Sequence, residues 1–421
     1  MGRSRNRRRK QQKLVNLDWT ELPRGILEII FERLTVTDCI SVSDVCKAWR
    51  HVVAQELAGW QSRGVPWLMM SGKDGEVRTC ISILQKQHWD IVLPEAYGKY
   101  CWGSYQDWLI LVKHIGCFYL EISLLNPFSR NKTDLPKTWN FYHKIVLSGL
   151  PILDNYVCLL VHSQCRELSF WVPGAESWFK HKLDGDPFED AVFCDGSFYL
   201  ISNDYNIWQI KSANIFASIR TYDAYEVKID CHEVIMSEEQ ENSGVLKYLV
   251  ESCGELLLVC RLYNTKAEAI LETHDFKVYS LDFSLMSWKR VHDLGDKILF
   301  LGKCCSRSVS STELGVAMRN RIYFSNDHAA PWWNEWDSDH LYGISARLNL
   351  NNAGRKDWGV FSLGNGTHED FCFRGNRDRW GPIWDSLFSI LFHLAYQRGG
   401  AYFSDDESLK MLHVQVRRPA Y

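Results

Sequence analysis

The chain has 421 residues, of which 46% are hydrophobic and 24% charged, and its formal net charge is −3. This balance is ordinary for a globular protein, and the length allows two or three domains, or one small domain beside a large one. No apolar run reaches the ~18 residues that a membrane-spanning helix needs.

The first thirteen residues carry +7 without an acid, which leaves −10 on the remainder. Because like charges repel, residues 1–17 are expected to form a disordered, solvated tail. Two alternatives stay open, namely a nuclear-targeting signal at Arg7, Arg8, Arg9 and Lys10, and contact with nucleic acid. The tail lacks the apolar segment of a secretory signal peptide, so a nuclear or cytoplasmic location with reduced thiols is expected.

The fourteen cysteines are irregularly spaced, and no C-x-x-C pair occurs. A structural zinc site needs paired ligands at such spacing, so no metal site is expected. The sequence also has no phosphate-binding G-x-x-x-x-G-K-[ST], no G-x-S-x-G and no H-E-x-x-H. We therefore expect no cofactor and no catalytic residue, and most cysteines should be small buried apolar residues.

Helical periodicity begins at Pro23, a residue that suits the first turn of a helix. Apolar residues then recur at i, i+4 and i+7–8 spacing up to Leu34. Thr37 or Asp38 can cap a second short helix, and Asp44 can cap a third. Because three such short helices bury little surface alone, some of their apolar area is left over for a partner.

After Trp67 the pattern changes to short apolar runs rich in β-branched and aromatic residues, such as "WLILV" (108–112) and "YVCLLV" (156–161). About eighteen to twenty such strands precede residue 362 with no helix-length crossover, which predicts antiparallel pairing in a sandwich, barrel or propeller. The span is too long for one sandwich, and blades of ~40–50 residues would give six or seven.

Glycine-centred turns that open a strand recur at 101–112, 194–202 and 252–260. This recurrence favours a propeller. The tryptophans that close blade-like units have irregular intervals, which leaves open that each is simply a large core residue.

Residues 19–52, "WTELPRGILEIIFERLTVTDCISVSDVCKAWRHV", resemble an F-box. The matching landmarks are Leu22-Pro23, the apolar run to Leu34, Asp38, Val45-Cys46 and Trp49-Arg50. The phrases "LLNPFSRNKTDLP" (124–136), "FKVYSLDFSLMSWKRVHDLGDKILFLG" (276–302), "STELGVAMRNRIYFSND" (311–327) and "DWGVFSLGNGT" (357–367) resemble the KIB-type C-terminal domain of a plant F-box family.

The resemblance implies a mainly β protein with four parts. These are the tail 1–17, a three-helix F-box at 18–60, a KIB-type β-propeller-like domain at 61–379, and a C-terminal extension at 380–421. The extension departs from the family pattern, and its apolar stretch 383–397 suggests a helix. How the last blade closes is left open.

The family further implies a non-catalytic substrate receptor of an SCF-type cullin–RING ubiquitin ligase. Its F-box docks on a Skp-type adaptor, which connects to the cullin and RING subunits, and its propeller binds an unknown protein substrate. The positions that match the apolar adaptor contacts are Leu22, Pro23, Ile26, Leu27, Ile30, Leu34, Val45, Cys46 and Trp49. Trp49 is the expected anchor, and about half of the set should belong to the helical core instead.

A segment rich in acids and tryptophan, residues 326–343, is a candidate for substrate contact because loops carry function on a rigid frame. Its candidate residues are Trp332, Trp333, Glu335, Trp336, Asp337 and Asp339. The alternative is an insertion whose tryptophans fold back onto a blade.

Two other functions remain open at this point. One is an adaptor-binding regulatory scaffold that works without a cullin. The other is a nucleic-acid-associated protein that uses the basic tail, which would give binding that falls steeply with salt.

Overall fold

A computed structural model describes a large part of the chain. The described residues are 22–31, 42, 46, 49, 52, 67–69, 76–82, 87–106, 108–116, 119–127, 130–139, 142–162, 167–185, 187–217, 225–227, 229–231, 234, 244–264, 272–312, 318–324, 359–369 and 390–392. The chain divides into two compact units, of which the first contains helix α1 (Arg24–Phe31) and the second contains every described strand. In the described residues no helix is long and apolar enough to cross a membrane.

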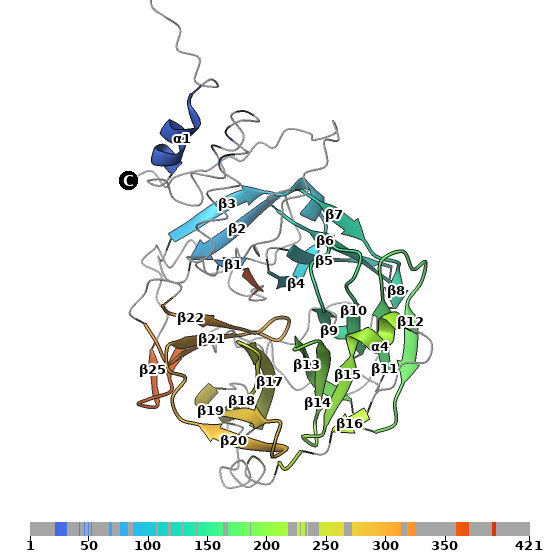
Figure 1. The fold of residues 1–421 in the computed structure, drawn as a ribbon, viewed down its shortest axis with the longest axis vertical. Coiled ribbons are helices and arrows are strands. Elements are labelled where there is room, and N and C mark those ends of the chain that lie inside the picture. The colour runs from blue at the N-terminus through green and yellow to red at the C-terminus, as the bar shows by residue number, and fades with distance from the viewer. Residues whose placement is uncertain are drawn as a thin grey trace, which may run out of the picture. The chain divides into compact units, whose positions relative to one another are not determined.

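The described strands form six sheets (Figure 1). Sheet A has the order β26-β1-β2-β3, with β1 (Trp67–Met69), β2 (Val77–Ser82), β3 (Gln87–Val92) and β26 (Ile390–Phe392). Sheet B has the order β4-β5-β6-β7, with β4 (Tyr100–Tyr105), β5 (Trp108–Ile115), β6 (Tyr119–Leu125) and β7 (Lys132–Asp134), while β8 (Thr138–Trp139) also pairs with β6.

The next two sheets follow in chain order. Sheet C has the order β12-β11-β10-β9, with β9 (Tyr142–Leu147), β10 (Cys158–His162), β11 (Glu167–Trp171) and β12 (Phe179–Lys182). Sheet D has the order β13-β14-β15-β16, with β13 (Phe188–Cys194), β14 (Ser197–Ser202), β15 (Ile207–Lys211) and β16 (Tyr225–Val227).

Sheets E and F complete the set. Sheet E has the order β17-β18-β19-β20, with β17 (Gly244–Ser252), β18 (Glu255–Asn264), β19 (Glu272–Asp282) and β20 (Ser287–Val291). Sheet F has the order β22-β21-β23-β24-β25, with β21 (Lys297–Leu301), β22 (Arg307–Ser310), β23 (Arg321–Phe324), β24 (Gly359–Ser362) and β25 (Thr367–Glu369). Among the described residues between strands are the short helices η3 (Pro94–Ala96) and α4 (Ser212–Ala217).

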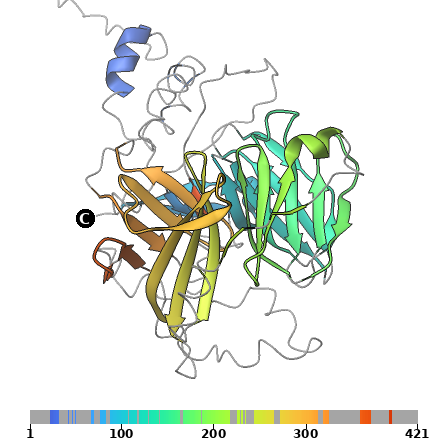
Figure 2. The ribbon, with the colours of Figure 1, turned by 60° about the horizontal axis from the view of Figure 1, so that its bottom comes forward.

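Pairing among the described strands is antiparallel except between β21 and β23, which run parallel. Neighbouring sheets contact one another through β26, β4, β9, β13, β17 and β22, in that order. Figure 1 shows the sheets arranged around a common centre, and Figure 2 shows the long strands of sheet E beside those of sheets C and D. This is a propeller, and the six described sheets agree with the expected six or seven blades.

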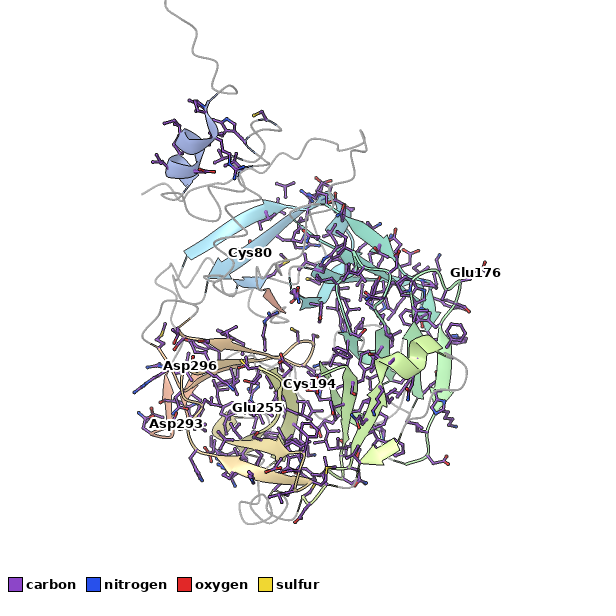
Figure 3. The ribbon with its side chains drawn as sticks, viewed as in Figure 1. Cys80, Glu176, Cys194, Glu255, Asp293 and Asp296 are labelled. Carbon is purple, nitrogen blue, oxygen red and sulfur yellow. The ribbon has the colours of Figure 1, made fainter. Side chains whose placement is uncertain are left out.

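The core lies between the sheets, where side chains fill the spaces (Figure 3). One cluster joins Ile110 and Val112 of β5 to Leu147 of β9 and Leu160 of β10, and three similar clusters join sheets C and D, D and E, and E and F. Each middle strand therefore packs on both faces. This is why β5 and β10 read as continuous apolar runs rather than alternating ones.

Two of the three predicted glycine-centred turns are confirmed as hairpin turns. Asp195-Gly196 and Cys253-Gly254 have φ of 42° and 74°, and of 54° and 83°, the two positive values that a type I′ turn needs. Gly103 instead lies inside β4, where the register shifts, and an added Cβ would lie 3.5 Å from the Cys304 carbonyl oxygen. Gln106, with φ of 52°, makes that turn.

The expectation of a helix across 383–397 is wrong at residues 390–392, which form β26. This strand pairs antiparallel with β1, so that Trp67 lies opposite Phe392 and Met69 opposite Ile390. A short apolar segment forms a strand when it can pair with a neighbouring strand, and here the pairing with β1 overrides the local helical pattern. The propeller therefore includes β26 and reaches beyond residue 379, because β26 pairs with β1 and completes sheet A.

A buried histidine makes the stability of the propeller depend on pH. His162 Nε2 lies 3.1 Å from Ser169 Oγ and 3.2 Å from Glu167 Oε1, and burial lowers its pKa to about 4. Since an unfolded histidine titrates near 6.5, the unfolded state binds the extra proton as the pH falls from about 6.5 to about 4. We expect this to remove on the order of 2 kcal/mol of stability across that window, and none above it.

Urea unfolding of the propeller at a series of pH values tests this expectation. His162→Gln should flatten the dependence between pH 6.5 and 4. His292→Gln, which removes an exposed imidazole, is the matched control and should leave the slope in place. An unchanged slope in His162→Gln contradicts the prediction.

Candidate functional site

Helix α1 begins where the sequence predicts. The carbonyl oxygen of Pro23 accepts hydrogen bonds from the backbone N–H groups of Ile26 (2.9 Å) and Leu27 (3.2 Å). Proline has no N–H to lose at this position, and its fixed φ suits entry into the helix. Arg24 and Glu28, one turn apart, form an exposed ion pair of 2.6 Å on the polar side.

The apolar side of α1 is wider than the part that the chain itself covers. At 100° per residue, Ile29, Ile26, Ile30 and Leu27 span an arc of about 160°. Leu27, at one edge of this arc, is 1% exposed, and Ile30 is half-buried. Ile26 and Ile29, at the other edge, are 47% and 53% exposed. Two neighbouring isoleucines on a helix therefore remain open to a partner.

The predicted adaptor-binding residues divide by burial. Leu27 belongs to the core, since a side chain with almost no exposed area has none to offer a partner. Pro23 and Ile26 are exposed, whereas Leu22, Cys46 and Trp49 are half-buried. Leu34 and Val45 lie outside the described residues. Ile29 was missed because the i, i+4, i+7 template leaves it off the central line of the apolar face.

Cys46 has a local structural role. The N–H of Trp49 donates a hydrogen bond to Cys46 Sγ over 3.4 Å, and Val42, Trp49 and Val52 have helical backbone. A side chain that accepts from the N–H three residues later is the arrangement of a helix N-cap, here with sulfur in place of oxygen. Val52, whose backbone is also helical, is buried.

Leu27→Ala is expected to destabilise the unit that contains α1 by about 2–5 kcal/mol, because it opens a cavity at a fully buried position. The measurement is the rate of limited proteolysis within residues 18–60 of the full chain. Ile29→Ala removes a largely exposed side chain of the same helix and should leave that rate within twofold. Equal rates for the two variants would contradict the assignment of Leu27 to the core.

A buried ion pair joins the neighbouring strands β9 and β13 of two consecutive blades. Lys144 Nζ on β9 lies 2.6 Å from Asp190 Oδ1 on β13, and both side chains are 5% exposed. Asp190 Oδ2 accepts the N–H of Leu249 on β17 (2.8 Å). Burial by itself lowers the pKa of Lys144, but the Asp190 carboxylate outweighs it and raises the pKa. One carboxylate thus links three consecutive blades.

A second buried pair follows beside it. Glu189 Oε2 lies 2.9 Å from Lys247 Nζ on β17, and Glu189 Oε1 accepts the N–H of Lys247 (3.0 Å). The ammonium also donates to the Asn203 carbonyl oxygen (3.1 Å) and lies 4.1 Å from the centre of the Tyr205 ring. These charges are fully engaged with one another, so they act as ties between blades.

Six of the ten described thiols are buried, whereas Cys253 is exposed and Cys46, Cys231 and Cys305 are half-buried. Burial raises the pKa of Cys101 to about 12 and of Cys194 and Cys231 to about 11, so almost none of each is thiolate near neutral pH. Within the described ranges, no three His, Cys, Asp or Glu side chains are grouped so that they could hold a metal ion.

Several predicted features lie outside the described residues. They are the tail 1–17 with Arg7, Arg8, Arg9 and Lys10, and the candidate substrate loop with Trp332, Trp333, Glu335, Trp336, Asp337 and Asp339.

Comparison with known proteins agrees with both resemblances. The model of the family described as "KIB1-4 beta-propeller" matches residues 80–362, and the model "F-box-like" matches residues 19–63. "F-box protein At2g26160" of Arabidopsis thaliana is 25% identical over 347 residues, which cover 73% of this chain and 95% of the relative. "F-box protein SKIP23" of the same plant is 23% identical over 358 residues, covering 71% and 81%.

Among solved structures, "YCF48 from Cyanidioschyzon merolae" matches with a TM-score of 0.33 and 14% identity, covering 53% of this chain and 68% of that one. The sheets and the family model, and not this likeness, show the propeller fold. An F-box joined to a β-propeller is the arrangement of SCF-type substrate receptors, which are generally non-catalytic, and an F-box implies binding to a Skp-type adaptor. The chain belongs to the plant F-box proteins that carry a KIB-type β-propeller.

Proposed function

We propose that this protein is the substrate-recognition subunit of a cullin–RING ubiquitin ligase. The exposed side of α1 contacts the Skp-type adaptor, and the adaptor connects the chain to the cullin and RING subunits. The propeller holds a protein substrate. The observation that carries the proposal is the pair Ile26 and Ile29 on α1, whose exposed apolar area a partner would cover.

The proposed mechanism is proximity. A receptor that holds its substrate beside a charged ubiquitin-conjugating enzyme converts an encounter in solution into a reaction within one assembly. No group of this chain needs to change its protonation or form a covalent bond. The buried ion pairs between blades support this role, since a rigid frame is what positioning requires.

The test is co-purification of the full chain with a Skp-type adaptor, a cullin and a RING subunit, followed by ubiquitin transfer to proteins that the chain retains. We expect all three subunits to co-purify, and retained proteins to be modified only when the complex is complete. Capture of the adaptor without the cullin favours the regulatory scaffold. Failure to bind any Skp-type adaptor overturns the proposal.

A further inference from the structure

Two aromatic side chains lie together on the surface of sheet B. Tyr119 at the start of β6 and Trp139 at the end of β8 are directly opposite in the strand pairing. Their ring centres are 5.5 Å apart with a 42° tilt, and the side chains are 45% and 47% exposed. Large aromatic rings that stay exposed in a well-packed propeller are typical of interaction surfaces.

The aromatic pair is held in place by its neighbours. Leu120 and Thr138, the adjacent opposed pair, are both buried and fix the two strands to the core. Trp178 Nε1 donates to the Pro136 carbonyl oxygen (2.7 Å), which ties the segment before β12 to the segment before β8. β8 and β12 therefore lie side by side, at the right of Figure 1. A surface that is ordered before binding loses little entropy when a partner arrives.

Lysines surround this pair. Lys180 Nζ on β12 lies 5.9 Å from the centre of the Trp139 ring and 3.1 Å from Glu167 Oε1. Lys137 Nζ lies 3.2 Å from Glu121 Oε1. Exposed lysines at 113, 137, 180 and 182 therefore outnumber the carboxylates of Glu121 and Glu167 next to the aromatic pair, while exposed Glu176 and Asp184 lie in the segments before and after β12.

We propose that Tyr119, Trp139 and the surrounding lysines form a docking surface for an acidic, extended segment of a protein that contains an aromatic or proline residue. That residue stacks on the Tyr119–Trp139 pair while its acidic neighbours contact Lys137 and Lys180. On the function proposed above, this segment belongs to the substrate.

The edge strand next to the rings favours a peptide over a nucleic acid. β12 is the last strand of its sheet among those described, and Lys180 and Lys182 alternate along it at the spacing of an extended chain. A peptide that adds to this edge would place every second side chain beside a lysine. Nucleic acid, which also combines phosphate with stacking bases, is the competing outcome.

The probe is a short fluorescein-labelled peptide of alternating glutamates around a central Trp-Pro, measured by fluorescence anisotropy with the full chain. The controls are its all-lysine counterpart and a single-stranded oligonucleotide. We expect the acidic peptide to bind with a salt-dependent affinity, and Trp139→Ala to weaken it at least about tenfold. Phe283→Ala, at another exposed aromatic residue in the turn between β19 and β20, should leave the affinity unchanged.

A charge-reversal variant distinguishes a loss of binding from a loss of folding, because it should bind the other peptide. Lys137→Glu with Lys180→Glu changes exposed side chains only, and should turn the preference from the acidic to the basic peptide. Equal binding of both peptides by the native chain, no effect of either variant, or tighter binding of the oligonucleotide would each overturn the inference. If the adaptor binds and the acidic peptide does not, the docking surface is wrong while the receptor function stands. If the acidic peptide binds and the adaptor does not, the receptor function is wrong while the docking surface stands.

Discussion

Replacing Asp190 by alanine is expected to destabilise the propeller by about 3–5 kcal/mol. The change leaves the Lys144 ammonium buried without its carboxylate, and an uncompensated buried charge costs that much. It also removes the acceptor of the Leu249 N–H on the next blade. Denaturant unfolding of the full chain, followed by near-ultraviolet circular dichroism, measures the loss.

Two variants make that result interpretable. Glu255→Ala breaks a 3.5 Å ion pair between the exposed Glu255 of sheet E and Lys297 of sheet F, and should change stability by no more than about 0.5 kcal/mol. Lys144→Met combined with Asp190→Ala removes the stranded charge, and should recover part of the loss. A single Asp190→Ala variant as stable as Glu255→Ala would show that the pair does not tie the blades together.

Ile26→Asp together with Ile29→Asp is expected to reduce adaptor binding at least a hundredfold. Each carboxylate would have to lose its water against an apolar partner surface, while exposed positions of the free chain accept it readily. The measurement is the dissociation constant for a Skp-type adaptor by calorimetry. Because both side chains are largely exposed, the melting temperature of the free chain should stay almost constant.

The matched control places the same charge on the polar side of the helix. Glu28 already forms an exposed ion pair there, and Arg24→Asp should weaken adaptor binding far less than the double variant. Adaptor affinity that survives Ile26→Asp with Ile29→Asp would place the contact elsewhere, with Trp49 the first position to examine.

Strand content was predictable from the sequence because burial on both faces leaves a direct signature. β5 and β10 are continuous apolar runs, and both lie inside the inter-sheet core. The turns at Gly196 and Gly254 were equally predictable, since glycine adopts a positive φ more easily than other residues do. Gly103 lies inside β4 and not in a turn. It stands where the register of β4 shifts and where the strand approaches Cys304, and no local sequence pattern indicates either feature.

Features that depend on distant partners were not predictable. Periodicity marked the apolar arc of α1, but it did not tell that Leu27 is covered while Ile26 and Ile29 are not. Lys144 reads as a solvated residue of an edge strand, and its buried carboxylate comes from the next blade. The strand at Ile390–Phe392 is too short to be recognised without β1, which precedes it by most of the chain.

That pairing of β1 with β26 also bears on the order of events during synthesis. Sheet A cannot be completed until Ile390 has left the ribosome, because Ile390 pairs with Met69 in the folded sheet. Contacts between positions so remote in the chain form slowly. The amino-terminal helix can therefore meet its adaptor while the blades are still being translated, and truncations ahead of residue 390 should yield chains with an open, aggregation-prone strand edge.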